Sequence, residues 1–484
     1  MAEIQRPNLI LITTDQQRFD TVGRYGNPDI YTPHLNWMAD TGVLCRRAYS
    51  DAPVCCPARA TMITGMHYRN MHGYGGWGPP TAPDAATTLP GLLTRQGYQT
   101  RSIGKVHYHP PRCHYGFEHM EILEDYYRFM RQFPDRGIPM DHGMGQNEME
   151  PVISTVDESW SLTRWLVNRA IDFVETRDPT RPFFLNLGFA KPHAPFDPCL
   201  NYWQLYAQAN LPAPAIGDWS ADPARIPPGF LTPTWTLNGG DRLSPQVLQQ
   251  AKKAYYACIT QIDYNLGYLL ARLRELDLLD HSLIIFTADH GEMMGDHHMG
   301  AKTVFLEGSA HVPMLVRGPA ELVPSDQVGR PSEELFCLAD LMPTFLAAAG
   351  VPAGAQPAQD GLNILDVLHG RARGRSSFIG AYAGQFCVLR EGWKYIYTNV
   401  GGAELLFDLA ADPYEQKNLA TQPAHASRKA ALHRELVEAL TASGSADVAD
   451  GRFVVKPVPK ESEERLHRWP GFHSREFTPV DVLH

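Results

Sequence analysis

The sequence predicts an α/β fold: a large mixed, mostly parallel sheet sandwiched by helices, followed by a smaller C-terminal domain with an antiparallel sheet and a helix. Apolar runs of strand length alternate with helical stretches along most of the chain, which is typical of a parallel sheet covered on both faces. Near the C-terminus, short aromatic alternations such as residues 393–397 replace this rhythm. The 484 residues, 44% of them hydrophobic, suffice for one large core and a smaller second domain.

Two apolar runs, far apart in the sequence, end in residues of the types that bind metal ions. Residues 8–16 form one run and residues 283–292 contain the other, and each is a short continuous apolar stretch as expected of a buried parallel strand. The side chains at their ends are Asp15, Gln16, Asp289 and His290. A single strand that ends in Asp is usually an ordinary turn or helix cap. Two such ends favour a cation site at the carboxyl edge of the sheet.

Two further predicted strands, residues 98–103 and 183–189, are followed by cationic or titratable side chains. Lys105 and His107 follow the first, and Lys191 and His193 follow the second. The expected helices of this part of the chain are residues 33–39, 57–64, 89–96, 156–176 and 246–276.

The change from alternating strands and helices to short aromatic alternations predicts that the chain has three parts. Residues 1–372 form the catalytic α/β domain, residues 373–450 form the C-terminal α+β subdomain with a helix at 427–442, and residues 451–484 form an arm that makes subunit contacts. The proline-rich stretch 211–245 shows no regular period and is expected to be an ordered insertion. The long arm predicts a homo-oligomer, either a dimer or a tetramer.

Composition excludes some function classes. A formal net charge of -10 with no basic stripe argues against nucleic acid as a partner. No signal peptide precedes the first strand and no apolar run is long enough to cross a bilayer, so we expect no membrane association and a cytoplasmic location. The eight cysteines lack framework spacing, which suits reduced thiols.

A pentapeptide at the start of the second expected helix suggests a modified nucleophile. Cys55-Cys56-Pro57-Ala58-Arg59 matches the pattern Cys-x-Pro-x-Arg, by which a cysteine is marked for oxidation to formylglycine. The register selects Cys55, because a start at Cys56 would put alanine where proline is required. By itself so short a match is weak, since two adjacent thiols also suit a buried strand-to-helix turn. In the helix that follows, the N-terminal amides would face this residue and favour negative charge there.

These segments, in this order, resemble the formylglycine-dependent type I sulfatases of the alkaline phosphatase superfamily. Residues 406–409, 412–413 and 418–419 also resemble the C-terminal signature of that family, and the likeness spans residues 8 to about 420. It implies an alkaline phosphatase-like fold and an arylsulfatase-type enzyme, and a formylglycine-generating enzyme as its maturation partner.

The resemblance assigns a role to each motif residue. One divalent cation is bound by Asp15, Gln16, Asp289, His290 and an oxygen of the modified Cys55. Arg59 and Lys105 steady the modified residue. His107 is the base that collapses the covalent intermediate, while His193 and Lys302 hold the sulfuryl oxygens and assist the leaving group.

The implied chemistry explains why these residue types are needed. A formylglycine hydrate carries two hydroxyls on one carbon, and a cation lowers the pKa of one hydroxyl so that it attacks sulfur. Lysine and arginine neutralise charge as the ester bond breaks. Histidine then deprotonates the second hydroxyl, and sulfate leaves as the aldehyde re-forms. Serine or threonine in place of Cys55 lacks that exit, so the cysteine favours sulfatase over phosphatase turnover.

Two positions depart from the commonest sulfatase pattern. Gln16 and His290 stand where many sulfatases have Asp and Asn, and they resemble the phosphonate monoester hydrolases of the same superfamily. A nitrogen donor among oxygens shifts the expected metal from Ca²⁺ towards Mn²⁺. Lys105 and His107 fit the arylsulfatases better.

Three functions remain open on this evidence. The leading one is hydrolysis of aryl or alkyl sulfate monoesters, with promiscuity towards phosphonate monoesters and phosphate diesters. The alternative is a phosphonate monoester hydrolase or phosphodiesterase that uses the same formylglycine. A non-catalytic binding protein is disfavoured, because every position that catalysis requires carries a suitable residue.

Histidine-rich stretches raise the possibility of zinc. The two clusters are His107, His109, Cys113 and His114, and Asp296, His297 and His298. The first is interrupted by two prolines and lacks a usual structural spacing, so neither cluster is included in the predicted metal site. The loop aromatics Tyr74, Trp77, Tyr115 and Phe117 either stack on an aryl leaving group or are structural.

Overall fold

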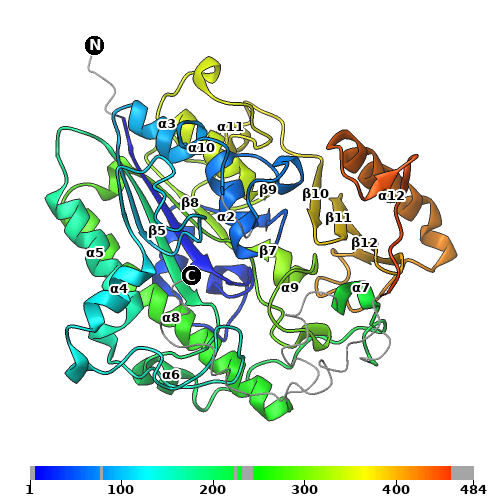
Figure 1. The fold of residues 1–484 in the computed structure, drawn as a ribbon, viewed down its shortest axis with the longest axis horizontal. Coiled ribbons are helices and arrows are strands. Elements are labelled where there is room, and N and C mark those ends of the chain that lie inside the picture. Colours follow the sequence, from blue (N-terminus) through cyan, green and yellow to red (C-terminus); the bar gives the residue numbers. More distant parts are fainter. Residues whose placement is uncertain (1–5, 77–79, 223–225, 232–243, 459–484) are drawn as a thin grey trace.

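A nine-stranded sheet with helices on both faces forms the body of the protein, and a separate four-stranded sheet lies to one side (Figure 1). The computed structural model describes residues 6–76, 80–222, 226–231 and 244–458. The strands of the large sheet are β1 (Asn8–Asp15), β2 (Val43–Tyr49), β3 (Gln99–Gly104), β4 (His119–Glu121), β5 (Phe183–Pro192), β6 (Ser282–Ala288), β7 (His311–Val312), β8 (Met314–Arg317) and β9 (Pro331–Cys337). This architecture confirms the predicted fold class.

The centre of the large sheet is parallel. Strands β4, β3, β5, β1 and β6 lie side by side in that order and run in the same direction. Strand β8 is antiparallel to β6 and to β2, and β9 pairs in parallel with β2, which makes the sheet mixed. The carboxyl ends of β1, β5 and β6 therefore meet at one edge of the sheet.

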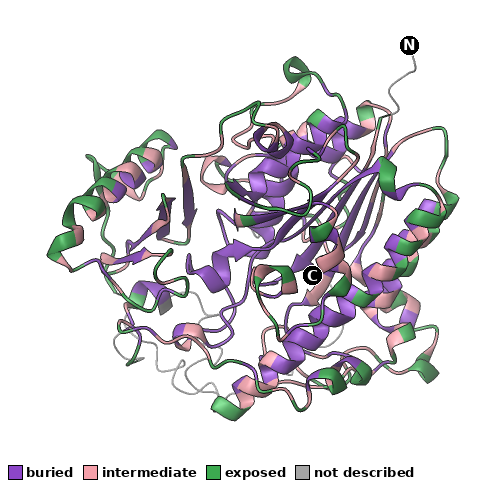
Figure 2. Ribbon diagram, turned by 180° about the vertical axis from the view of Figure 1, so that it is seen from behind, coloured by how far each residue is buried: buried purple, intermediate pink, exposed green. Residues whose placement is uncertain are grey.

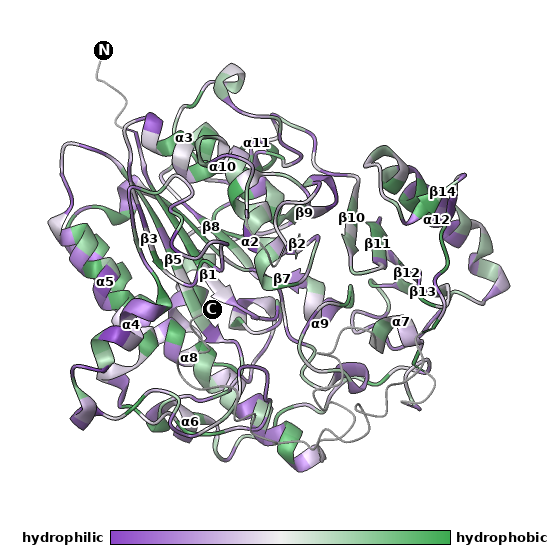
Figure 3. Cartoon of the chain, in the orientation of Figure 1, coloured by the Kyte–Doolittle hydropathy of each residue, from purple (hydrophilic) through white to green (hydrophobic). Residues whose placement is uncertain are grey.

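Strand β1 shows why the sequence is continuously apolar here. Successive side chains of a strand point to opposite faces, and both faces of this sheet are covered. Leu9 and Leu11 pack into one core, and Ile10 and Ile12 pack into the other. Figure 2 shows the central strands buried along their length, and Figure 3 shows their apolar composition.

Two sets of helices cover the two faces. Helices α1 (Pro33–Asp40), α5 (Leu162–Thr176) and α8 (Pro245–Glu275) share the core of Ile10. Helices α2 (Cys55–Thr64), α3 (Leu89–Arg95), α10 (Leu341–Ala348) and α11 (Ile364–Leu368) share the core of Leu9. The shorter helices are α4 (Leu123–Met130), α6 (Leu200–Tyr206), α7 (Pro228–Leu231) and α9 (Glu307–Ala310).

The predicted helix at residues 156–176 starts six positions later than expected. Helix α5 begins at Leu162, and the Oγ of Ser161 accepts a hydrogen bond from the Arg164 N–H at 3.2 Å. Serine caps a helix in this way because its side chain satisfies an N–H that has no partner within the first turn. The preceding residues instead form a short 3₁₀ turn at Glu158–Trp160.

The smaller sheet consists of β10 (Ser377–Tyr382), β11 (Gln385–Arg390), β12 (Trp393–Thr398) and β13 (Ala403–Asp408), antiparallel in chain order. Helix α12 (Ala426–Ala442) packs on one face, and the pair β14 (Val448–Ala449) and β15 (Arg452–Phe453) follows. The other face packs against the body through residues such as Phe305 and Ile396.

Some expectations concern residues outside the described ones. They include 459–484 of the predicted arm and 223–225 and 232–243 of the proline-rich insertion. Among the helices that the structure does describe, none combines the length and the apolar character that crossing a membrane requires.

Candidate active site

The carboxyl edge of the large sheet brings together side chains that lie far apart in the sequence. Thr14 of β1 pairs with Ala288 of β6, so Asp15 and Asp289 leave the sheet side by side. The backbone N–H of Gln16 donates to Oδ1 of Asp289 at 3.1 Å across 273 positions of sequence. All three side chains are fully buried.

Donor atoms of two carboxylates, an imidazole and a thiol converge at this edge. The group consists of Asp15, Cys55, Asp289 and His290, whose candidate ligand atoms lie within 4.8 Å of one another. Nε2 of His290 is 3.7 Å from Oδ1 of Asp15 and 3.6 Å from Oδ1 of Asp289. Nδ1 of His290 lies 2.9 Å from the Gly291 carbonyl, so a hydrogen bond there leaves Nε2 free of its proton for a metal.

Cys55 is the first residue of helix α2, after Val54 in extended conformation. Its Sγ lies 3.2 Å from Nε2 of His290 and 3.7 Å from Oδ1 of Asp15. Burial by itself raises the pKa of this thiol, but the surrounding cations and donors outweigh it and hold the pKa well below the usual range. These groups are Lys302, Lys105, His290 and, through a hydrogen bond, His107. The position therefore favours a negatively charged atom.

Arg59 and Lys105 neutralise the two buried carboxylates in part. Nε of Arg59 donates to Asp289 at 2.9 Å, and its Nη2 donates to Asp15 at 3.3 Å. Nη1 of Arg59 donates to the Lys105 carbonyl at 2.8 Å, and Nζ of Lys105 lies 2.7 Å from Oδ2 of Asp15. Both cations approach the Oδ2 side of Asp15, which leaves Oδ1 directed at His290 and Cys55.

The donor set fits a divalent cation. Burial raises the pKa of Asp289, because Arg59 compensates its charge only partly. Burial also acts to raise the pKa of Asp15, but Lys105 and the other nearby cations hold that pKa below its usual range. Two buried carboxylates with one imidazole supply the oxygen-rich, singly nitrogen-containing set that suits Mn²⁺ or Ca²⁺.

A chain of hydrogen bonds links Gln16 to the remaining predicted residues. Nζ of Lys302 donates to Oε1 of Gln16 at 2.6 Å and lies 2.7 Å from Nε2 of His193. Nε2 of Gln16 donates to Oε2 of Glu292. Burial and the charges of Lys302 and Lys105 lower the pKa of His193 to about 4, so this imidazole is neutral near pH 7 and accepts from Lys302.

His107 lies on the loop after β3, half-buried, and its side chain takes part in the hydrogen bonding of the Cys55 thiol. Its backbone adopts the left-handed region with φ of 52°, which is uncommon for a residue with a side chain. Such conformations cluster at functional sites, where the surrounding structure holds them in place.

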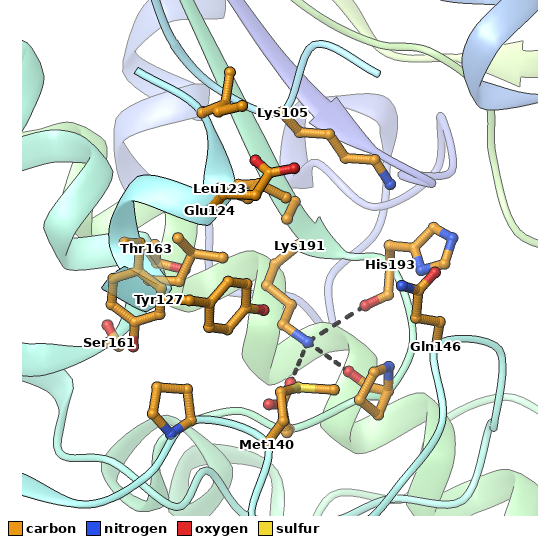
Figure 4. A pocket seen from close by; sticks show the side chains of 18 of the residues that line it. Lys105, Leu123, Glu124, Tyr127, Met140, Gln146, Ser161, Thr163, Lys191 and His193 are labelled. Atoms are coloured by element: carbon orange, nitrogen blue, oxygen red, sulfur yellow. Dashed lines mark hydrogen bonds and ion pairs between the residues drawn. The ribbon is translucent and has the colours of Figure 1, made fainter. Parts of the chain in front are cut away.

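A cavity of about 200 Å³ opens beside these residues. Lys105 and His193 line one side of it, and Tyr127 and Met140 lie across from them (Figure 4). The side chain of Lys191 lies along the cavity wall, and its Nζ donates to the carbonyl of Pro195 at 2.7 Å (Figure 4). A cavity lined by both apolar and charged side chains next to the cation cluster is a candidate ligand pocket.

The loop aromatics are less available to a substrate than the sequence allowed. Tyr115 and Phe117 are each only 3% exposed and belong to the hydrophobic core, and Trp77 lies outside the described residues. Tyr127 of α4, which the sequence did not single out, lines the cavity instead.

The second histidine-rich cluster has structural partners. Asp296 forms an ion pair with Arg18 at 2.7 Å, and Nδ1 of His297 lies 2.9 Å from the Ser220 hydroxyl. In the first cluster, Cys113 is exposed and His114 bonds to the Phe117 carbonyl. The structure joins His107 and His109 to Cys56 instead, a pairing that no spacing in the sequence indicated.

Comparison with known proteins agrees with this fold. The family model described as Sulfatase matches residues 7–351, and the model described as N-sulphoglucosamine sulphohydrolase, C-terminal, matches residues 295–442. The chain belongs to the sulfatase family. This membership implies a divalent cation and a formylglycine at the site.

The relatives are sulfuric ester hydrolases. An arylsulfatase of Clostridium perfringens is 31% identical over 94% of this chain and 98% of its own length. A choline-sulfatase of Rhizobium meliloti is 27% identical over 86% of this chain and 83% of its own. Together with the family match, these relatives identify the protein as a sulfuric ester hydrolase.

A solved structure with a different activity is also similar. The phosphonate monoester hydrolase of Agrobacterium radiobacter is 26% identical, covers 90% of this chain and 96% of its own, and superposes with a TM-score of 0.77. The sequence resemblance to both branches is thus found again in the comparisons.

Proposed function

We propose that the protein hydrolyses sulfate monoesters through a formylglycine formed from Cys55, with one Mn²⁺ or Ca²⁺ at Asp15, Gln16, Asp289 and His290. The observation that carries the proposal is the position of Cys55. It is the first residue of α2, and its sulfur points at His290 and Asp15 within a ring of cations. An unmodified thiol needs no such surroundings, whereas an attacking hydroxyl does.

The cation, when bound, supplies a Lewis acid that lowers the pKa of a coordinated hydroxyl. The residues of the chain perform the remaining tasks. Arg59 and Lys105 fix Asp15 and steady the modified residue 55. Lys302 lies close enough to residue 55 to share its charge with a sulfuryl oxygen placed between them. The Nδ1–H of His193 donates to the Ala194 carbonyl at 2.8 Å and its Nε2 accepts from Lys302, so His193 acts on the sulfuryl group by orienting this lysine.

Turnover requires a base for the second hydroxyl of the aldehyde hydrate. His107 is the candidate, because its side chain reaches residue 55 and it lies on the cavity side of the site. Removal of that proton lets the carbon–oxygen bond to sulfate break and the aldehyde return, so water need not attack the sulfate ester.

The alcohol leaves into the cavity lined by Leu123, Tyr127 and Met140. This lining suits an aryl or alkyl group better than a highly charged one. Glu124 lines the same cavity (Figure 4), so its carboxylate favours a leaving group that carries a positive charge over one that carries a negative charge.

Hydrolysis of phosphonate monoesters or phosphate diesters is the second candidate function. The similarity to the Agrobacterium radiobacter enzyme and the pair of Gln16 and His290 favour it. One cation and one charged pocket accommodate several tetrahedral centres, so we propose promiscuity towards these esters in addition to the sulfatase activity.

The test compares kcat/KM for a nitrophenyl sulfate, a phenylphosphonate monoester and a phosphate diester on one Mn²⁺-supplemented preparation. Conversion of Cys55 is first measured by peptide mass. The sulfate ester is expected to give the highest value. Dominance of the phosphonate or the diester would transfer the assignment to the second candidate.

Replacement of the nucleophile completes the test. Cys55→Ala abolishes hydrolysis of every ester if residue 55 attacks. Cys45→Ala is the matched control, because Cys45 is also a fully buried thiol but belongs to the core. Undiminished turnover by Cys55→Ala would exclude the proposed nucleophile. The cytoplasmic location, the maturation enzyme and the dimer or tetramer remain part of this proposal.

A further inference from the structure

One thiol and two imidazoles meet next to the active site, and none of the three belongs to the predicted ligands of the first cation. Cys56 is the second residue of α2, and His107 and His109 lie on the loop after β3. Candidate ligand atoms of the three residues lie within 4.8 Å of one another. Sγ of Cys56 is 3.6 Å from Nε2 of His109, and the rings of His107 and His109 are 5.7 Å apart.

The sulfur–nitrogen distance already matches tetrahedral zinc. Zinc binds thiolate sulfur at about 2.3 Å and imidazole nitrogen at about 2.0–2.1 Å. At a tetrahedral angle these bond lengths require sulfur and nitrogen to lie about 3.6 Å apart. The separation of the Cys56 sulfur and the His109 nitrogen therefore already suits a shared ion, and the His107 ring has to come closer to them.

The surrounding structure holds two of the ligands in place. The backbone N–H of His109 donates to the Thr81 hydroxyl at 2.6 Å, and its carbonyl accepts from the Thr81 N–H at 3.0 Å. Cys56 is 1% exposed within helix α2. Both histidines line the cavity, so the fourth zinc position faces the space where water or a substrate group can enter.

We propose that Cys56, His107 and His109 bind Zn²⁺ as a second, inhibitory metal site. One thiolate and two imidazoles favour zinc over Mn²⁺ and Ca²⁺, which prefer oxygen ligands. Coordination replaces the Cys56 thiol proton, which passes to solvent. The bound ion holds the His107 imidazole, so this side chain can no longer take a proton from residue 55.

The two halves of this proposal have different foundations. Zinc binding rests on geometry alone, whereas inhibition rests on the role of His107 in the proposed function. The three residues do not overlap with the group of Asp15, Cys55, Asp289 and His290, so we expect the second ion to bind in addition to the first.

Binding is tested on Mn²⁺-loaded protein that carries Cys55→Ala, which removes the other thiol of the site. Calorimetric titration with Zn²⁺ and absorption titration with Co²⁺ are compared with the same protein carrying Cys56→Ser or His109→Ala. His114→Ala is the matched control, since His114 lies on the same loop but bonds to the Phe117 carbonyl.

We expect one zinc equivalent in addition to the manganese and a thiolate-to-cobalt charge-transfer band. Loss of an outer metal partner already weakens binding about 10- to 100-fold. Loss of the Cys56 or His109 ligand should therefore weaken it about 100-fold or more, and Cys56→Ser should remove the band. If both variants bound zinc as tightly as the parent protein, or if zinc uptake only released manganese, the proposed site would be overturned.

Inhibition is tested on mature protein with excess Mn²⁺. Zinc should inhibit sulfate ester hydrolysis in the wild type and in His114→Ala, and at least tenfold more zinc should be needed in His109→Ala. Zinc that binds without inhibiting would overturn the inhibitory half of the proposal. Absence of hydrolysis in zinc-free wild type would instead refute the proposed function and leave the binding result standing.

Discussion

Replacement of Lys302 by methionine tests the charge distribution of the active site. The Lys302 side chain is 2% exposed and joins Gln16 to His193 through contacts of 2.6 and 2.7 Å. Methionine has an unbranched side chain one atom shorter than that of lysine, so it fills most of the same space and removes the cation. Two consequences follow, one for catalysis and one for the titration of His193.

The catalytic effect follows from the lost transition-state stabilisation. Removal of one preorganised donor from a buried reaction centre costs about 10²–10³ in kcat, or about 2.7–4 kcal/mol. We therefore expect kcat for nitrophenyl sulfate to fall by about 10²–10³. KM should change less, because the charge acts mainly as the ester bond breaks.

The titration effect has a defined sign. Burial, Lys302 and Lys105 lower the pKa of His193 from its ordinary 6.5 to about 4. The unfolded chain thus takes up the proton first, and stability falls as the pH drops from 6.5 towards 4 by on the order of 3 kcal/mol. In Lys302→Met the pKa of His193 rises towards its ordinary value, so this acid loss of stability becomes smaller.

The assay combines turnover with urea unfolding at pH 7 and pH 5. Lys253→Met is the matched control, because Lys253 is also buried but donates to the Ala207 carbonyl at the end of α6. A kcat of Lys302→Met within threefold of the wild type, in folded and fully converted protein, would refute the role assigned to this cation.

Three further predictions concern stability, metal and specificity. Lys394→Met leaves Glu307 and Glu415 without their buried cation and should lower the free energy of unfolding in urea by about 3–5 kcal/mol. Lys429→Met removes a partly exposed ion pair and should lower it by no more than about 1 kcal/mol. Equal losses in the two variants would contradict this prediction. Removal of the metal by a chelator should lower both the activity and the unfolding temperature, because the buried carboxylates lose their counter-charge, and Mn²⁺ should restore both. An unchanged unfolding temperature, after elemental analysis has verified the loss of metal, would count against the cation site. Glu124→Gln should reduce, by roughly tenfold, the ratio of kcat/KM for a trimethylammonio-substituted to a carboxylate-substituted phenyl sulfate, and an unchanged ratio would remove Glu124 from the specificity determinants.

Local sequence patterns predicted four strands of the large sheet, β1, β3, β5 and β6, and the polar side chains that follow them, but not β2, β4, β7, β8 or β9. A short continuous apolar run is typical of a buried parallel strand, which is why β1 and β6 and their polar ends are predictable from the sequence. The sequence pattern places the start of helix α5 too early, because its helical periodicity continues on the N-terminal side of Ser161, whose capping side chain marks the true beginning.

The sequence by itself determined the fold class, the Cys55 motif and the set of side chains at the strand ends, because these depend on short-range patterns. Only the tertiary structure decided which of those side chains touch. The sheet order places Asp15 beside Asp289, and the loop after β3 turns His109 towards Cys56 across 53 positions. Glu292 likewise emerged as the partner of Gln16 only in three dimensions. Contacts of this kind depend on how separate elements pack, and no local spacing in the chain encodes that geometry.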